Sequence, residues 1–297
     1  MKRVVIAGAS GLIGTALTEE LRARGDEVVR LVRKNPGPGD VLWDPASRTI
    51  DPAALDGATA VVNFSGASIG RLPWTPGYKR EILASRVAAT STLVTAIRAA
   101  AVPPEVFISS SAAGYYGSRP HETLTEDSAR GTGFLSDVTA EWERTARRAD
   151  DVTRVVIARS GIVVATDGVL KPLLLLTRAG LSGPLGGGEQ LWPWVSLVDE
   201  TRALVHLLDG TLAGPVNVTG PTAASANDLM RHLAMRLNRP FFLPVPAFAV
   251  TAALGDAARD LLLVDQHPQP ARLLGDGFVF THRTVEKAVD AALIRGR

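Results

Sequence analysis

The first fifteen residues constrain the fold more than any other part of the sequence. The segment RVVIAGA (3–9) reads as a buried strand, and GLIGTALTEELRARG (11–25) reads as an amphipathic helix that ends at Gly25. Three glycines follow at three-residue spacing: Gly8 near the end of the strand, and Gly11 and Gly14 in the first turn of the helix. A strand that enters a helix through such a turn is typical of a dinucleotide-binding fold; a glycine turn without a ligand is the alternative.

Each of these glycines has a distinct predicted role. Gly8 permits the tight turn, Gly11 lets the backbone approach a pyrophosphate at the helix N-terminus, and Gly14 permits close packing of helix on sheet. The residues between the glycines complete the predicted cofactor turn: Ser10, Leu12 and Ile13.

The N-terminal half continues to alternate strands and helices. Its pattern predicts strands at 27–33, 58–66, 105–112 and 153–164, and helices at 79–101 and 133–149. This alternation predicts an α/β fold of the Rossmann type, in which a doubly wound parallel sheet is covered on both faces.

After residue 165 the alternation loosens. We expect helices at 167–181 and 196–210, the second capped at Asp199, a strand at 214–220, and a mostly helical segment at 225–297. Residues 1–165, completed by 196–220, are the predicted dinucleotide domain; residues 166–195 and 221–297 form a smaller C-terminal lobe on the substrate side. In the Gly-rich loop 183–200, Trp192 and Trp194 either form an apolar wall for a ligand or pack an ordinary hairpin.

The composition excludes several classes of protein. There is no Cys, which excludes disulfides and thiolate chemistry and suits a cytoplasmic protein. The net charge is only +2 and the Arg residues are scattered among acids, so we expect no nucleic-acid partner. No apolar run reaches 18 residues, so we expect no membrane partner. No His, Asp or Glu cluster has metal-ligand spacing, so we expect no metal, and the chain is expected to be a monomer or a homodimer.

The end of the second predicted strand indicates which dinucleotide is bound. An NAD site usually places an acid there, to accept a hydrogen bond from the ribose 2′-hydroxyl. This sequence reads LVRKN, with Arg33 and Lys34 and no acid. A guanidinium suits a 2′-phosphate, so the sequence favours NADP(H) over NAD; the alternative is that both are only solvated loop charges.

Further segments resemble a known family. VVNFSG (61–66), SSSAAGYYG (109–117) and RSGIVV (159–164) resemble the extended short-chain dehydrogenase/reductases. WTPGYKREILASRVAAT (74–90), FLSDVTAEWE (134–143) and the segment 243–280 resemble its atypical NAD-dependent epimerase/dehydratase-like group, whose members carry a C-terminal domain of unknown function. The resemblance covers essentially the whole chain.

The resemblance implies further cofactor contacts. The loop after the strand 58–66 should line the dinucleotide, and the segment 160–163 should approach the nicotinamide. Arg86 either pairs with a phosphate or is an ordinary surface residue of its helix. The residues so implicated are Phe64, Ser65, Gly66, Glu81, Arg86, Ser109, Ser160 and Val163.

The family's catalytic pair is missing. The extended reductases use a Tyr-x-x-x-Lys pair, in which the Lys lowers the Tyr pKa, and a Ser that polarises the substrate. Counting back from Glu143, the Tyr and Lys positions fall on Leu135 and Thr139. Ser111 best matches the Ser, and Tyr116 is the first candidate to replace the Tyr, with aromatic packing under the loop as the alternative role for Tyr115 and Tyr116. Weaker candidates are Tyr115, Tyr78, Lys79, His121 and the pair Asp137 and Glu141.

Two functions therefore stay open at the level of sequence. The first is an NADP(H)-dependent oxidoreductase or epimerase-like enzyme that acts on an unknown small metabolite through an unconventional proton donor or water. The alternative is a non-catalytic NADP(H)-binding sensor or partner-binding protein, which the loss of Tyr and Lys favours.

Overall fold

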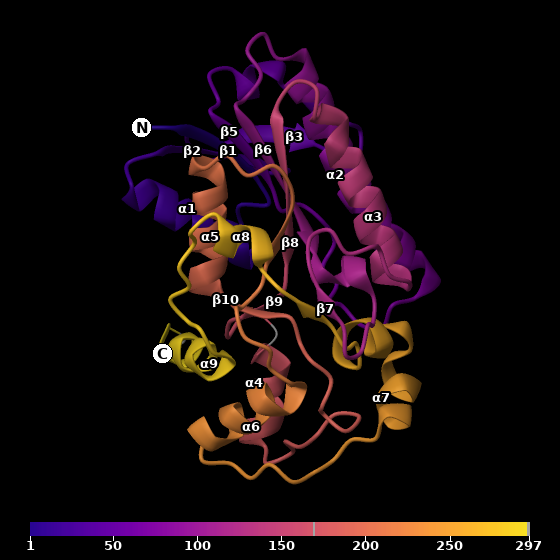
Figure 1. Ribbon diagram of the computed structural model, residues 1–297. Helices are drawn as coiled ribbons and strands as arrows, with labels where there is room; N and C mark the ends of the chain where they lie inside the picture. Colours follow the sequence, from indigo (N-terminus) through magenta and orange to yellow (C-terminus); the bar gives the residue numbers. More distant parts are fainter. Residues whose placement is uncertain (169, 296–297) are drawn as a thin grey trace.

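The computed structural model describes residues 1–168 and 170–295 and is built on one central sheet of eight strands (Figure 1). Across the sheet the order is β11 (Gly214–Val218), β8 (Arg154–Ser160), β6 (Val106–Ala112), β5 (Ala60–Asn63), β1 (Arg3–Ala7), β2 (Glu27–Val32), β3 (Val41–Asp44) and β4 (Thr49–Ile50). All neighbours are parallel except β3 and β4. The predicted Rossmann-type parallel sheet is thus confirmed.

The strand order locates the place where a ligand binds such a sheet. From β1 the chain first moves outward to β2 and β3, then returns and continues on the other side with β5, β6 and β8. The reversal lies between β1 and β5, whose registers pair Ala7 with Asn63 at their carboxyl ends. In open α/β sheets the ligand crevice lies outside the carboxyl ends at this switch point.

Helices cover both faces of the sheet. The helices α1 (Leu12–Ala23), α5 (Leu197–Asp209) and α8 (Ala271–Gly275) bury their apolar residues against one face, and α2 (Pro76–Ala99) and α3 (Phe134–Ala146) cover the other. Side chains on β6 and β8 alternate between the two faces, so Ile108 faces α5 and Phe107 faces α2. Short 3-10 turns occur at Pro52–Leu55, Ala113–Tyr116 and Arg147–Ala149.

Three predicted boundaries are wrong for identifiable reasons. The helix α5 is capped by Ser196, whose hydroxyl accepts the N–H of Asp199; Asp199 is the third residue of the helix. The predicted strand 153–164 is two strands, β8 and β9 (Ile162–Val164), separated at Gly161. A Cβ on Gly161 would lie 2.0 Å from the carbonyl oxygen of Pro193, so only glycine allows β9 to leave the sheet and pair with β10 (Trp194–Ser196). In addition, α2 begins at Pro76 rather than at the predicted residue 79, because Thr75 caps it.

The C-terminal lobe lies at the lower end of the molecule in Figure 1 and has its own apolar core. It contains α4 (Leu170–Arg178), α6 (Ala226–Arg236), α7 (Ala247–Leu254), a π-helical turn (Ala258–Leu262) and α9 (Val285–Arg295). The short strand β12 (His267–Pro268) pairs with β7 (Thr123–Leu124) and ties the lobe to the sheet domain. The predicted helical segments 167–181 and 225–297 include residues 169 and 296–297, which lie outside the described residues.

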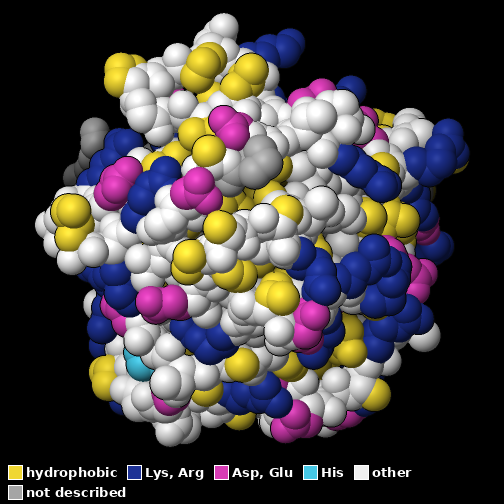
Figure 2. All heavy atoms as spheres, turned by 90° about the horizontal axis from the view of Figure 1, so that it is seen from above, with side chains coloured by type: hydrophobic (Ala, Val, Ile, Leu, Met, Phe, Trp, Pro, Cys, Tyr) yellow, Lys and Arg dark blue, Asp and Glu magenta, His cyan; other side chains and the backbone are white. Residues whose placement is uncertain are grey.

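The surface charge is mixed on the face shown in Figure 2. There, Lys and Arg side chains are spread over much of the face, with Asp and Glu side chains between them. Such a mixture differs from the single-sign stripe that binds a nucleic-acid backbone. Among the described residues, no helix is both long and apolar enough to cross a membrane.

Candidate functional site

The glycine turn after β1 is packed too closely for any larger residue at two positions. Gly8 has φ +82°, and a Cβ there would lie 2.9 Å from the backbone carbon of Phe64. A Cβ on Gly14 would lie 2.3 Å from the carbonyl oxygen of Gly8. Gly11 is the N-cap residue of α1 and provides no side-chain cap, so the first N–H groups of the helix are open to a ligand. This geometry fits a pyrophosphate at the helix N-terminus.

The loop after β5 lies directly against this turn. The Phe64 N–H donates to the carbonyl of Ala7, and the side chain of Asn63 accepts the N–H of Ser65 at 3.0 Å. Phe64 and Ser65 are half-buried and Gly66 is exposed. The structure thus brings the predicted contacts of the loop and of the glycine turn together at the switch point.

Arg86 on α2 is a cation without a counter-charge. One guanidinium nitrogen donates to the carbonyls of Ala67 (3.1 Å) and Ile82 (3.0 Å), and the group lies 5.1 Å from the ring centre of Trp142. No carboxylate of the described residues holds its charge, and burial lowers the pKa of Arg86 to about 10. The buried indole N–H of Trp142 also has no partner among the described residues. The Arg86 guanidinium lies against Gly66 and has donors left over, which fits an anionic, oxygen-rich ligand.

Arg33 and Lys34 follow β2 and are exposed, as is Glu81 on α2. The first acid after β2 in the sequence, Asp40, is already engaged. Arg30 donates two hydrogen bonds of 2.7 Å to the carboxylate of Asp40, and the Asp40 side chain is only 4% exposed. Asp40 is therefore not free to accept a bond from a ribose hydroxyl.

The positions of the missing catalytic pair are filled by structural side chains. Leu135 lies in an apolar cluster with Trp74, Tyr78 and Val138. The hydroxyl of Thr139 donates back to the carbonyl of Leu135 at 2.8 Å, within α3. The helix that would present Tyr and Lys is retained, but neither position offers a proton donor or a cation.

Ser111 belongs to a buried ionic network beneath the site. Its hydroxyl donates to Glu143 at 2.7 Å, and Glu143 accepts two further bonds from Arg159 at 2.8 and 2.9 Å. The three side chains are at most 4% exposed. Burial alone would lower the pKa of Arg159, but its bonds to Glu143 outweigh burial and raise the pKa above its ordinary value.

Tyr116 completes the same network. Its hydroxyl donates to Asn217 at 2.7 Å and accepts from Arg159 at 2.9 Å, and the side chain is fully buried. Burial raises the pKa of Tyr116 above its ordinary value. Arg159 also lies 3.5 Å from the ring centre of Tyr115. Because the hydroxyls of Ser111 and Tyr116 are both engaged inside the protein, a catalytic role for either stays a prediction.

The weaker candidates are engaged by other groups or lie at the surface. The hydroxyl of Tyr78 donates to the carbonyl of Ser68, and Lys79 pairs with Asp256 at 2.6 Å. The other three lie at the surface: Asp137 pairs with Arg130, Glu141 pairs with Arg144, and His121 is exposed in a loop with φ +63°. The structure does not assemble them into one site.

The two tryptophans of the Gly-rich loop form part of the core of the lobe. Trp192 and Trp194 are at most 2% exposed, and their indole N–H groups donate to the carbonyls of Leu262 and Thr222. The expectation of an apolar wall facing a ligand is therefore wrong. The two indoles pack a core, as in the alternative, but the segment is not a hairpin, because β10 pairs in parallel with β9. Sequence could not decide, because an indole suits either environment.

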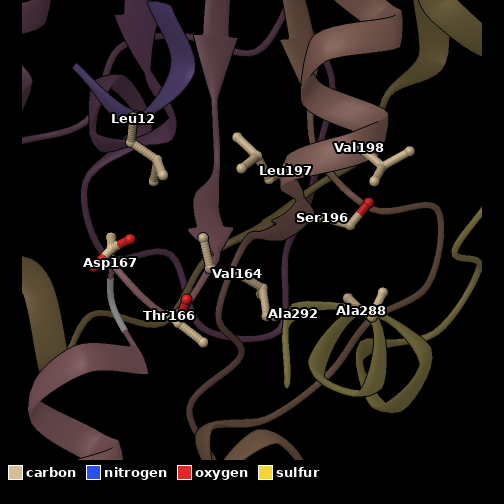
Figure 3. Close-up of a pocket in the computed structure, with 11 residues that line it drawn as sticks. Leu12, Val164, Thr166, Asp167, Ser196, Leu197, Val198, Ala288 and Ala292 are labelled. Carbon is tan, nitrogen blue, oxygen red and sulfur yellow. The ribbon is translucent and has the colours of Figure 1, made fainter. Parts of the chain in front are cut away.

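A small cavity of about 150 Å³ joins the glycine turn to the C-terminal lobe (Figure 3). Leu12, at the start of α1, faces it from one side, and Ala288 and Ala292 of α9 face it from the other. Its polar groups come from Thr166, Asp167 and Ser196. Leu12 therefore links this cavity to the predicted cofactor turn.

Sequence reasoning missed the carboxylate that supports the end of β8. Glu200 on α5 is fully buried and accepts a 2.7 Å bond from Ser160, while its second carboxylate oxygen has no partner among the described residues. Burial raises the pKa of Glu200 to about 7. Ser109, in the middle of β6, is also fully buried, and Val163 is half-buried. An acid in an otherwise ordinary amphipathic helix gave no signal in the sequence.

Glu200→Gln is expected to flatten the pH dependence of stability. The folded pKa of about 7 exceeds the ordinary 4.5, so the folded state holds a proton that the unfolded state releases. The wild type should therefore lose about 3 kcal/mol between pH 4.5 and 7, a loss that the glutamine variant lacks. Urea unfolding at pH 5 and pH 8 measures this difference. Equal pH dependence in both proteins would contradict the assignment.

Comparison with known proteins identifies the family. The model of the NAD dependent epimerase/dehydratase family matches residues 4–219, and a domain of unknown function, DUF1731, matches residues 245–292. The chain belongs to the NAD dependent epimerase/dehydratase family. Both parts of the resemblance seen in the sequence are thus confirmed.

Relatives from this family align along nearly their whole length. The epimerase family protein Mb2239 of Mycobacterium bovis is 39% identical over 98% of both chains. The human epimerase family protein SDR39U1 is 34% identical over 94% of this chain and 95% of its own. The crystal structure of human SDR39U1 isoform 2 with NADPH has a TM-score of 0.89 and 33% identity, and covers 98% of this chain and 99% of that one.

The described part of the chain contains no group of three or more His, Cys, Asp or Glu side chains that could hold a metal ion. What the site offers instead is a glycine turn, uncapped backbone N–H groups and an unpaired guanidinium. These are donors for an anionic ligand.

Proposed function

We propose that this chain binds NADP(H) at the switch point and transfers hydride to or from a small polar metabolite. The observation that carries the binding proposal is the unpaired, largely buried guanidinium of Arg86, which lies against Gly66 in the loop after β5. A buried cation without a counter-charge is costly, and a phosphate would supply that charge.

In this proposal the chain holds the cofactor through three sets of groups. The glycine turn receives the pyrophosphate, the loop after β5 lines the dinucleotide, and the ends of β6 and β8 approach the nicotinamide. The proposed contacts are Gly8, Ser10, Gly11, Leu12, Ile13, Gly14, Phe64, Ser65, Gly66, Glu81, Arg86, Ser109, Ser160 and Val163. When bound, the cofactor would supply or accept a hydride at its nicotinamide ring.

The preference for NADP(H) over NAD(H) rests on charge. Arg33 and Lys34 are exposed at the end of β2, and Asp40 is neutralised by Arg30. A 2′-phosphate would therefore meet two cations and no free carboxylate. The related human protein was crystallised with NADPH, which supports the same preference.

Arg33→Glu is expected to weaken NADPH binding on the order of 10–100-fold and to change NADH binding little, because only NADPH carries the 2′-phosphate. Calorimetric titration of the variant with both cofactors measures the two effects. The matched control is Arg80→Glu, which makes the same charge change at an exposed position on α2 and should leave the affinity for both cofactors unchanged. An unchanged NADPH affinity in Arg33→Glu would show that the 2′-phosphate binds elsewhere.

The proton transfer must differ from that of the relatives that use Tyr and Lys. Leu135 and Thr139 offer no acid, and Ser111 is bonded to Glu143. We propose that Ser111 polarises the substrate only by exchanging this bond, and that water or an unconventional group moves the proton.

A second candidate function is NADP(H) binding without turnover, as in a redox sensor. The engaged hydroxyls of Ser111 and Tyr116 and the apolar Leu135 favour it. An NADPH-oxidation screen against a panel of aldehydes and ketones separates the two. Turnover supports the oxidoreductase; cofactor binding without turnover, with a change in association state, supports the sensor.

A further inference from the structure

One end of the C-terminal lobe carries an unusual share of the exposed apolar surface. Half of the exposed large hydrophobic side chains in the described part of the chain fall in the segments 170–188 and 229–255. These two segments make up less than a sixth of the sequence. The excess needs an explanation, because large contiguous apolar surfaces on a folded protein mark sites of interaction.

Five of these side chains lie on two segments that meet at Ser182. Leu175 and Leu176 lie on the outer side of α4 and are 65% and 45% exposed, and Leu181 follows the helix. The N–H groups of Phe242 and Leu243 both donate to the carbonyl of Ser182, at 3.0 and 3.2 Å, which places these residues beside Leu181. We call this set, Leu175, Leu176, Leu181, Phe242 and Leu243, the apolar patch.

Both charged side chains of α4 beside the apolar patch are basic. The segments 170–188 and 229–255 contain five Lys or Arg residues and no Asp or Glu, but acids directly flank both segments and Arg236 is paired with Asp290 of α9 at 2.8 Å. Lys171 and Arg178 are exposed on the same side of α4 as Leu175, at positions i−4 and i+3 from it. α4 thus presents Leu and basic side chains outward and buries Leu170, Leu173 and Leu174.

We propose that the apolar patch and its basic residues dock the protein on an anionic lipid bilayer. Leucine and phenylalanine side chains flanked by lysine and arginine are the combination that binds the headgroup region of such a surface. The proposal departs from the expectation of no membrane partner, and it concerns contact with the surface of a bilayer rather than a span across it.

Charge argues against a second copy of the chain as the occupant. A twofold interface centred on the apolar patch would bring Lys171 and Arg178 of one copy close to the same two residues of the other, and like charges repel. An anionic bilayer attracts both residues, and Phe242, which is 65% exposed, can insert its ring.

Vesicle flotation tests the proposal with the full-length protein. Phosphatidylcholine vesicles are compared with vesicles that contain about one-third phosphatidylglycerol. The protein should float with the anionic vesicles, with partitioning on the order of tenfold above that with neutral vesicles. Two variants should each lower this partitioning on the order of tenfold: Leu175→Ser with Phe242→Ser, and Lys171→Glu with Arg178→Glu.

A control variant and the charge variant make the result of the flotation assay interpretable. Val102→Ser alters a side chain that is 70% exposed elsewhere and should float as the wild type does. The charge variant replaces only exposed side chains, so it tests the proposal even if the apolar variant folds poorly. Absence of flotation, or flotation that both variants leave unchanged, would overturn the proposal. A dimer in light scattering that the apolar variant abolishes, without vesicle binding, would overturn it in favour of a second copy.

Discussion

Arg159→Leu is expected to destabilise the fold by about 3–5 kcal/mol, because it leaves the buried carboxylate of Glu143 without its cation. The pair is bidentate, with N–O distances of 2.8 and 2.9 Å, and both side chains are at most 4% exposed. Arg159 also donates to Tyr116 and to the carbonyl of Glu126, so the substitution removes partners from several buried groups at once.

A double variant separates the destabilisation caused by an unpaired buried charge from the destabilisation caused by lost packing. Replacing Glu143 and Arg159 together by leucine removes both charges, so this protein should be less destabilised than either single variant. Arg144→Leu, which breaks the exposed pair with Glu141, should cost no more than about 1 kcal/mol. Urea unfolding measures all four. An Arg159→Leu protein as stable as Arg144→Leu would contradict a structural role for the network.

Arg86→Met is expected to weaken NADPH binding on the order of 10–100-fold while making the free protein more stable. The two effects have opposite signs because Arg86 is desolvated and has no counter-charge until an anion arrives. The flexible methionine side chain can still pack on Trp142 and beside Gly66. Calorimetric titration with NADPH and thermal unfolding of the free protein measure the two changes.

Arg98→Met on the same helix is the matched control. Arg98 is exposed and paired with Asp151, so its loss should leave NADPH affinity unchanged. If Arg86 served only to bond the carbonyls of Ala67 and Ile82, the variant Arg86→Met would instead lower stability and leave cofactor affinity alone. That result would remove the main support for the proposed phosphate contact.

Much of the fold could be predicted because its determinants are local. The glycine turn at residues 8–14 requires particular backbone geometry, and the apolar runs of β1, β5 and β6 have the length of buried strands. The loss of the Tyr-x-x-x-Lys pair was also visible from sequence, because spacing along one helix fixes where the pair must stand. That spacing places the two positions of the pair on α3.

The remaining features depend on residues that only the fold brings together. Glu143 and Arg159 meet because α3 packs on β8, and Ser160 meets Glu200 because α5 covers the opposite face. Arg86 lacks a counter-charge because none of the described elements packed around it places a carboxylate nearby. A local sequence pattern does not reveal this. The break at Gly161 had a signal, a glycine inside a strand pattern, but its cause is the distant carbonyl of Pro193.

Calorimetric titration of the purified protein with NADPH and with NADH tests the central claim most directly. The proposed site predicts that NADPH binds at least on the order of tenfold more tightly than NADH, because Arg33 and Lys34 meet the 2′-phosphate and no free carboxylate opposes it. Equal affinity for the two would contradict the NADP(H) preference. Absence of binding by either would contradict the cofactor site itself.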